Sequence, residues 1–458
     1  MRTRRRSTLD TPAARPDADG ASLGWPVALP PVVPPEALPP QPDLPRIKVL
    51  HVITRFWAGA GGNTLLSALG AAPDRYDVWV AGADGGPLWE RAERAGLRTV
   101  KLRRFREVLS PFDDLSVLWQ LVRLLRRERF TVVHTHSAKG GFLGRLAAWL
   151  TRVPLVVHTY HGFSYHDYMP AWRRRLYLTL ERLVRRFTHA FLAVSPRVAS
   201  EAVAMRLAPP GSVTVVPSAV ELDQLPDPPD PRLRKELGLP AGTRLVGTVG
   251  RLDFQKAPLD FVRMAARVAA ARPAVRFVMV GDGPMADEVR AEAERLGVEV
   301  ALVGFRADAP VLATAFDVFV ISSLYEGLGR ALTEALGSGR PVVATAVNGV
   351  PDLVVPGSTG LLAPPGDPGA LAESVTWLLD HPEEGRRMGG QGRVLVRTLF
   401  DPALMCELID RTYRHLLGLP DPGGQEIELT DRPQARPVAA AAATADARAG
   451  LVAEKRGA

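Results

Sequence analysis

The sequence predicts an α/β protein with two Rossmann-like domains, each built on a parallel β-sheet, that face each other across a cleft. Its 458 residues are too many for one ordinary domain and enough for two. In both halves, short apolar runs rich in β-branched residues alternate with helical patterns, which is typical of parallel sheets covered by helices on both faces. A proline-rich stretch at 225–231 separates the two halves.

The first domain is expected over 46–224. It opens with an apolar strand at 47–53, a glycine turn at 59–62 and a helix from about Asn63. Five further strands are expected, most with a helix between them: Val78–Ala81, Thr99–Leu102, Val132–His136, Leu155–Thr159 and Ala190–Val194. Continuous apolar strands of this kind indicate a sheet that is buried on both faces.

The second domain is expected over 244–398, after a linker at 225–243. Its expected strands are Leu245–Val249, Arg276–Val280, Ala301–Val303, Val318–Ile321 and Pro341–Thr345. A helix at 399–418 is predicted to pack back on the first domain. The ends of the chain, 1–45 and 419–458, are predicted to be disordered, because 11 of the 41 prolines lie in the first and an alanine run lies in the second.

Composition excludes several classes of protein. Apolar residues make up 46% and charged residues 23%, as in a soluble globular protein. The single cysteine, Cys406, excludes a disulfide framework and a cysteine-based zinc site. No stretch approaches the roughly 18 uninterrupted apolar residues of a membrane-spanning helix. The basic residues at 2–6 are not followed by the apolar segment of an export signal, so we expect a cytoplasmic protein.

Positive charge is concentrated in the first half of the chain. The formal net charge is +8, yet residues 46–225 hold 26 basic and 14 acidic side chains, a local +12. The rest of the chain is therefore net acidic. A basic domain indicates an anionic partner such as phosphates, nucleic acid or a lipid surface.

The most informative segment is 322–345. A strand is expected to end near Ile321, a turn holds Glu326, and a helix begins at about Leu328, with Glu334 one to two turns into it. The N–H groups and dipole of a helix N-terminus suit a pyrophosphate. Carboxylates beside such a site accept hydrogen bonds from hydroxyl groups. The pattern therefore indicates recognition of a sugar and a ribose next to a diphosphate.

This segment resembles the donor-site signature of the retaining glycosyltransferases of family 4, which have the GT-B fold. The signature reads E-G-x-G-x4-E-A-x3-G-x-P-V-V-A-T from Glu326. Three further stretches, 249–256, 277–284 and 302–305, are similar to other family elements. The resemblance covers roughly Ile47 to His415. Each motif alone would be weak evidence for the family, but their combination is specific.

The resemblance implies a role for each matching residue. Arg251 and Lys256 would grip the donor diphosphate, Glu326 would hold the sugar hydroxyls and Glu334 the ribose. His161 would orient the donor sugar and the acceptor hydroxyl near the anomeric carbon. The other donor-binding residues that it implies are Gly61, Gly62, Gly304, Phe305, Gly327, Leu328, Gly329 and Arg330.

The sequence departs from the family pattern in two places. Leu328 and Arg330 stand where a phenylalanine and an apolar residue are frequent, and Ser218-Ala219 replaces the usual Asn-Gly. Neither change removes a charged donor contact, but both make the choice of donor sugar harder to predict.

Five histidines, His134, His136, His158, His161 and His166, follow predicted strands. A metal site is not expected from them, because the carboxylates lie in the other domain and no H-E-x-x-H is present. A buried structural role is preferred for His158. Lys139 resembles a residue of an acceptor-side loop in polysaccharide-assembly members and could meet an acceptor phosphate; a solvated loop lysine is the alternative.

Rival functions are less well supported. Gly281-x-Gly283-x-x-Ala286 imitates a dinucleotide-binding fingerprint, but it follows the second strand of its domain and no acidic partner is well placed. A nucleotide-sugar epimerase or a non-catalytic scaffold of the same fold stays open as an alternative. No nucleic-acid-binding module accompanies the basic charge. The only Asp-x-Asp, at 17–19, lies in the predicted tail.

The sequence thus predicts a metal-independent, retaining, hexosyltransferase-type enzyme with no cofactor and a nucleotide-diphosphate sugar as co-substrate. The acceptor is expected to be a glycan or a polyprenyl-diphosphate-linked sugar. Arginines mixed with large apolar residues predict binding to an anionic membrane surface at the inner membrane face. These arginines lie at Arg103, Arg104, Arg106, Arg123, Arg126, Arg127 and Arg129 and within 172–187.

Overall fold

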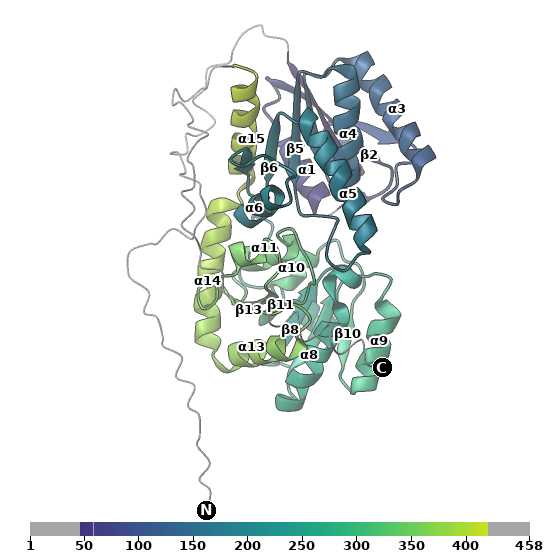
Figure 1. The fold of residues 1–458 in the computed structure, drawn as a ribbon. Coiled ribbons are helices and arrows are strands. Elements are labelled where there is room, and N and C mark those ends of the chain that lie inside the picture. Colours follow the sequence, from purple (N-terminus) through teal and green to yellow (C-terminus); the bar gives the residue numbers. More distant parts are fainter. Residues whose placement is uncertain (1–45, 58, 420–458) are drawn as a thin grey trace, which may run out of the picture.

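The structure is a computed structural model that describes residues 46–57 and 59–419. The predicted tails, 1–45 and 419–458, lie outside the described residues except for residue 419. Two α/β domains are stacked one above the other, with the first domain at the top of Figure 1. Each domain holds one fully parallel sheet, as the alternating sequence pattern predicts.

The first sheet has seven strands in the order β3-β2-β1-β4-β5-β6-β7. The strands are β1 (Ile47–Arg55), β2 (Tyr76–Ala83), β3 (Arg98–Leu102), β4 (Val132–His136), β5 (Leu155–Tyr160), β6 (Ala190–Ala193) and β7 (Val213–Val215). Strand β7 is not predicted by the sequence, because three half-buried residues at a sheet edge give no apolar run.

Helices cover both faces of this sheet. They are α1 (Ala60–Leu69), α2 (Pro87–Arg94), α3 (Pro111–Glu128), α4 (Ala138–Thr151), α5 (Ala171–Val184) and α6 (Pro196–Ala204). Helices α1 and α2 share one core with the β1 and β2 side chains of one face, while α3 and α4 share another core with those of the opposite face. Helix α4 lies between α3 and α5.

The second sheet repeats this strand order with one strand fewer, β10-β9-β8-β11-β12-β13. Its strands are β8 (Leu245–Val249), β9 (Arg276–Val280), β10 (Val300–Leu302), β11 (Val318–Ile321), β12 (Val342–Thr345) and β13 (Leu361–Ala363). The helices are α8 (Pro258–Ala271), α9 (Ala286–Leu296), α10 (Ala309–Ala313), α11 (Arg330–Gly337), α12 (Val350–Leu353) and α13 (Pro368–Asp380). The short strand β13 is not predicted by the sequence.

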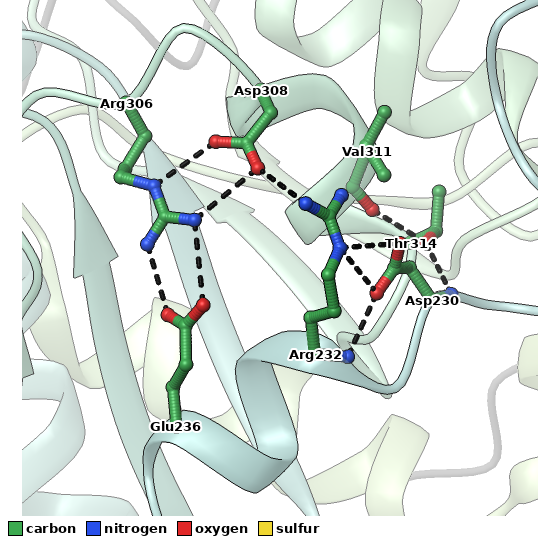
Figure 2. A network of polar contacts seen from close by, with 7 residues as sticks. All are labelled: Asp230, Arg232, Glu236, Arg306, Asp308, Val311 and Thr314. Atoms are coloured by element: carbon green, nitrogen blue, oxygen red, sulfur yellow. Dashed lines mark hydrogen bonds and ion pairs between the residues drawn. The ribbon is translucent and has the colours of Figure 1, made fainter.

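The segment predicted as a linker, 225–243, is fastened to the second domain. Its helix α7 (Arg232–Glu236) buries Leu233 completely. Figure 2 shows the polar network that holds it: Arg306 donates to Glu236 at 2.9 Å, and Arg232 donates to Asp308 at 3.1 Å. The proline-rich part before this helix is also attached, since the Asp230 N–H donates to Thr314 Oγ1 at 3.0 Å.

The last two helices connect the domains. Helix α14 (Pro382–Leu399) runs along the second domain, and α15 (Pro402–Leu416) lies against α1 of the first domain. Met405, Ile409 and Tyr413 of α15 belong to the core of the first domain. A further core cluster joins side chains of both domains, including Tyr160 and Phe319.

Within the described ranges, 46–57 and 59–419, no helix combines the length and the apolar character needed to cross a bilayer.

Candidate functional site

The candidate site lies where the strand order of each sheet reverses. Ligands of open parallel sheets bind beyond the carboxyl ends of the strands at this point. In the second domain the reversal lies between β8 and β11, and Arg251 and Glu326 follow these two strands. In the first domain it lies between β1 and β4, which carry His51, His134 and His136.

Glu326 is buried and held by several partners. Its carboxylate forms an ion pair with Lys256 and accepts from Ser323 Oγ at 2.9 Å. Gln255 Nε2 lies 3.4 Å from the other carboxylate oxygen. The backbone N–H of Glu326 donates to Asn348 Oδ1 at 2.9 Å. The carboxylate is therefore fixed in orientation, as a group that recognises hydroxyls must be.

Arg251 lies at the mouth of a small pocket. The pocket is lined by Thr248, Val249, Gly250, Arg251, Leu252, Lys256, Pro258, Met279, Ile321, Ser322 and Ser323. The Arg251 side chain is mostly exposed and pairs with Asp253 at 3.3 Å. Two cations, Arg251 and Lys256, therefore line one pocket beyond the carboxyl end of β8.

Helix α11 begins at Arg330, two residues later than the sequence predicts. Gly329 is its N-cap and has φ 85°, a conformation that favours glycine. Leu328 is buried beneath this turn. The backbone N–H groups at the start of α11 therefore have no helical partner, and the turn 327–329 leads directly to them.

Arg330 and Glu334 form an ion pair at the interface between the domains. Arg330 Nε donates to Glu334 Oε1 at 2.8 Å, and burial raises the pKa of Glu334 while Arg330 opposes this shift. Arg330 Nη1 is buried without a partner in the described part of the chain. A Cβ added to Gly62 would lie 2.7 Å from this atom, so the guanidinium reaches the first domain.

Gly61 and Gly62 lie in the first turn of α1, which begins at Ala60 rather than near Asn63. Only Gly59 of this turn has a positive φ, 66°. Gly61 and Gly62 are therefore not glycines because of a positive φ. Close approach is the reason for both, because a Cβ at Gly61 would meet the Phe56 backbone at 3.1 Å.

His161 stands opposite Glu326 across the domain interface. A Cβ added to Gly327 would lie 1.7 Å from the His161 carbonyl oxygen, and one on Gly162 would lie 2.7 Å from Gly327 Cα. The two backbones thus touch at two glycines. The structure brings His161 into contact with the residue that follows Glu326, although His161 and Glu326 are 165 positions apart in the chain.

Three imidazoles form a hydrogen-bonded chain that ends at His161. His51 Nδ1 lies 2.9 Å from His136 Nε2, and His136 Nδ1 lies 2.9 Å from His161 Nε2. A neutral imidazole has one N–H and one acceptor nitrogen. All three rings must therefore carry the proton on Nδ1, or all three on Nε2, and the Nδ1 of His161 stays free of this chain.

Burial keeps these histidines neutral. It lowers the pKa of His161 to about 4 and that of His51 to about 3. The pKa values of His134 and His136 lie well below the ordinary value for the same reason. At neutral pH the first domain therefore presents uncharged hydrogen-bonding groups to the interface.

His51, His134 and His136 could in principle hold a metal, since one ligand atom from each lies within 4.8 Å of the others. Both His134 nitrogens are in use, however. Its Nδ1 lies 2.6 Å from the Tyr413 hydroxyl and its Nε2 lies 2.7 Å from Thr159 Oγ1. Each of the three rings has protein partners, so hydrogen bonding explains the cluster.

The structure gives Lys139 a different role from the predicted one. Its ammonium donates to the carbonyl oxygens of Arg106 and Val108, both at 2.7 Å, and pairs with Asp114 at 2.5 Å. Two of its N–H groups thus bond carbonyl oxygens, and its charge is paired with the Asp114 carboxylate. Lys139 therefore anchors the loop before α3.

Gly304 and Phe305 lie at the edge of the second sheet, beyond β10. Gly304 has φ 70°, and its carbonyl oxygen accepts from Gly281 N at 2.9 Å. Gly281 in turn abuts the Gly250 backbone, next to Arg251. The Phe305 ring is 63% exposed, so its face is open to a planar ligand.

Sequence reasoning missed three residues of the site. His51 lies inside a strand with no motif, and Tyr413 comes from α15, far along the chain. Asn348, with φ 39°, binds the Glu326 backbone and also donates to Glu201 of α6 at 2.9 Å. Each acts through a contact between distant segments, so no local spacing could reveal it.

Two family models match most of the described chain. The model described as "Glycosyl transferase 4-like domain" matches residues 59–219, and that described as "Glycosyl transferases group 1" matches 229–394. The two matches fall on the first and the second domain respectively.

Curated relatives agree with these models. The chain is 30% identical over 312 residues to an Escherichia coli UDP-Gal:alpha-D-GlcNAc-diphosphoundecaprenol alpha-1,3-galactosyltransferase, covering 66% of this chain and 80% of that protein. It is 33% identical over 325 residues to the 2-deoxystreptamine N-acetyl-D-glucosaminyltransferase of Streptomyces fradiae, covering 65% and 76%.

Solved structures show the same fold. Anabaena HepE in complex with UDP aligns with a TM-score of 0.67 at 21% identity, covering 81% of this chain and all of that one. Sucrose-phosphate synthase from Thermosynechococcus elongatus aligns with a TM-score of 0.69 at 21% identity over the same shares. With the family models, the relatives and the two facing parallel-sheet domains in agreement, the chain belongs to the family 4 type of GT-B glycosyltransferases.

Proposed function

We propose that this glycosyltransferase is a retaining, metal-independent enzyme of the hexosyltransferase type, which moves a sugar from a nucleotide-diphosphate donor to a hydroxyl group of a glycan or lipid-linked acceptor. One observation carries the proposal. The Lys256–Glu326 pair, beyond the strands β8 and β11, lies directly opposite the His161 backbone of the other domain. Lys256 would bind the diphosphate and the fixed Glu326 carboxylate would bind the sugar. Both would face the uncharged, hydrogen-bonded histidines of the first domain.

The diphosphate would be bound by cations and backbone N–H groups. Lys256 has three N–H donors, and Glu326 is the one acceptor that its ammonium contacts among the described residues. Arg251 lines the same pocket, and the start of α11 adds N–H groups. As the bond to the anomeric carbon breaks, negative charge grows on the leaving phosphate, and donors fixed in advance stabilise it. This chain can therefore supply the required positive charge from its own residues.

The carboxylates would select the neutral parts of the donor. Glu326, held by Lys256 and Ser323, would accept hydrogen bonds from the sugar hydroxyls. Glu334 would accept from the ribose while paired with Arg330. Gly61 and Gly62, at the start of α1, would allow the backbone to approach the phosphates closely.

The chemistry needs no protein nucleophile. Glu326 is tied to an ammonium and a hydroxyl, which suits binding better than attack. The acceptor hydroxyl would attack the anomeric carbon from the face that the diphosphate leaves, and a phosphate oxygen would take its proton. The product would then keep the configuration of the donor sugar.

A lipid-linked acceptor is supported by one relative. The name of the Escherichia coli protein gives UDP-galactose as donor and a GlcNAc-diphosphoundecaprenol acceptor. We propose an acceptor of this chemical class, a sugar on a polyprenyl diphosphate, which would be reached at the cytoplasmic face of the inner membrane.

An exposed face of the first domain supports membrane binding. On α3 the rings of Phe112 and Trp119 are 87% and 60% exposed, and Leu115 between them is also exposed. Leu121, Leu124 and Leu125 of α3 are buried in the core. Other apolar residues of the same helix thus form the surface.

Helix α5 continues this surface. Trp172, Leu176 and Leu183 are exposed, and arginines alternate with them along the helix. Because α4 lies between α3 and α5, the three helices form one layer. Exposed aromatic and aliphatic groups among arginines suit an anionic bilayer, to which each nearby basic residue contributes about 1 kcal/mol.

The proposed reaction is tested by the product. Purified protein would be given a panel of nucleotide sugars and a short-chain polyprenyl-diphosphate GlcNAc. Release of a nucleoside diphosphate and an NMR spectrum in which the new linkage keeps the donor's anomeric configuration are expected. An inverted anomer would overturn the retaining mechanism. A product sugar epimerised without transfer, or donor binding with no turnover, would favour the epimerase or the scaffold.

Membrane binding is tested by co-sedimentation with vesicles of phosphatidylglycerol and phosphatidylcholine. The wild type should sediment with the anionic vesicles and be released by high salt. Trp119→Ser should weaken binding severalfold, and Trp377→Ser, an exposed tryptophan of α13, should leave it unchanged. A protein that ignores anionic vesicles at low salt would instead use a soluble acceptor.

A further inference from the structure

Four aromatic rings from both domains meet next to the Lys256–Glu326 pair. His166 and Tyr168 come from the segment between β5 and α5, and Phe254 and Tyr325 come from the second domain. The His166 and Tyr325 rings stack at 4.0 Å between centroids, and the Tyr168 and Phe254 rings meet edge to face at 5.6 Å. We call these four rings the aromatic platform.

The platform is tied to the donor-site residues. Tyr325 immediately precedes Glu326, and Phe254 lies two residues before Lys256. Gln255 Nε2 donates to the Tyr325 carbonyl oxygen at 3.1 Å and also lies 3.4 Å from Glu326. A ligand on these rings would therefore lie beside the sugar that Glu326 is proposed to hold.

The platform is only partly used by the protein. The Tyr168 and Phe254 rings remain 51% and 50% exposed although they pack against each other. His166 Nδ1 is buried and has no partner among the described residues. A contact that served only to join the domains would bury its rings and pair its polar atoms. Open ring faces next to an unused polar atom are instead typical of a ligand site.

We propose that the aromatic platform binds the sugar ring of the acceptor, an inference that rests on the function proposed above. A pyranose presents C–H groups on its faces, which pack on aromatic rings, and hydroxyls at its edge, which need polar partners. His166 Nδ1 and the Tyr168 hydroxyl can supply these partners. Burial raises the pKa of Tyr325, the Asp253 and Glu326 carboxylates raise it further and Arg251 opposes them, so charged groups border the platform. A hydrocarbon chain would leave these polar groups unpaired.

The platform would also supply the acceptor-binding group that Lys139 was predicted to be. The predicted acceptor-side residue, Lys139, is already held by two carbonyl oxygens and by an ion pair with Asp114. The rings of the platform come from both domains, and the platform lies next to the proposed position of the donor sugar. An acceptor held there would have its hydroxyl beside the donor's anomeric carbon.

The test uses simple glycosides as probes. Saturation-transfer NMR would be recorded for the methyl α-glycosides of glucose, galactose and N-acetylglucosamine. The full chain would be saturated beforehand with whichever of UDP, GDP or ADP raises its melting temperature most. The variants are Tyr168→Ala and Phe254→Ala, and Trp377→Ala serves as a matched exposed aromatic far from the site.

At least one glycoside should bind the wild type and Trp377→Ala equally, and both platform variants should weaken it at least fivefold. The thermal shift caused by the nucleotide should be unchanged. Equal glycoside binding by all variants, or no glycoside binding to a wild type that the nucleotide stabilises, would overturn the platform. A parallel loss of nucleotide stabilisation would show that the rings join the domains instead. A wild type stabilised by no nucleotide would refute the proposed function itself.

Discussion

The sheets of the two domains have the same strand order, but the side chains where this order reverses are charged in one domain and neutral in the other. In the second domain the groups are charged and paired, Lys256 with Glu326 and Arg330 with Glu334. In the first domain they are neutral imidazoles bonded to one another. The difference supports the roles that we propose: the second domain would bind the charged donor, and the first would supply fixed hydrogen bonds from uncharged groups.

The neutral histidines make the first domain sensitive to acid. The pKa of His51 is about 3 in the folded chain, and that of His134, His136 and His158 is also lowered, against about 6.5 when unfolded. Below pH 6.5 the unfolded state therefore binds more protons, so stability falls as pH falls towards 4. The expected slope is about 1.4 kcal/mol per pH unit for each histidine.

Urea denaturation followed between pH 7.5 and 4.5 measures this slope. His51→Gln should make it shallower, and His381→Gln, on an exposed histidine of the second domain, should not change it. A stability that is flat from pH 7 to pH 5 would show that these histidines have the same pKa in the folded and unfolded states.

The charged pair of the second domain should carry the largest effect on turnover. Lys256→Ala should lower kcat and raise the donor KM together, because its charge matters most as the leaving group forms. The expected loss is about 3 kcal/mol, roughly a hundredfold in rate. Steady-state kinetics would measure it, with the exposed Lys235→Ala as the control. Near wild-type turnover of Lys256→Ala would show that Lys256 does not stabilise the leaving group and is an ordinary surface lysine.

The imidazole chain should affect the reaction rather than donor binding. His136→Phe removes both hydrogen bonds of the chain and frees the His161 ring, so kcat should fall about tenfold with the donor KM unchanged. His134→Phe is the matched control, since His134 is equally buried but bonds Tyr413 and Thr159 instead. Equal losses in the two variants would mean that packing, and not the chain, supports His161.

Arg330, which stands where the family has an apolar residue, should have the smallest effect. Arg330→Leu removes the cation that opposes the raised pKa of Glu334, so nucleotide binding should weaken roughly fivefold. The loss should be larger at pH 6 than at pH 8, because Glu334 is then more often protonated. Calorimetric titration with the nucleotide measures it. Tighter binding by the variant would show that Arg330 occupies the ribose site of Glu334.

The sequence could predict what is local. The predicted strands and the spacing from Glu326 to Glu334 are encoded in continuous segments, and the structure shows both. Strands β7 and β13, which form one edge of each sheet, are not predicted. Tyr413 and Asn348 act across the domains, so no spacing reveals them. Lys139 was misjudged because its partners, the carbonyl groups before α3, have no signature in the sequence.

We propose above all that the interface between Glu326 and His161 binds a nucleotide-diphosphate sugar. Thermal-shift titration of the wild type and Lys256→Ala with nucleotide sugars, nucleoside diphosphates and monophosphates tests it most directly. We expect at least one nucleotide sugar and its diphosphate to stabilise the wild type, the monophosphate to do so weakly, and Lys256→Ala to lose most of the diphosphate's effect. A wild type that no nucleotide sugar stabilises, or that NAD stabilises instead, would contradict it.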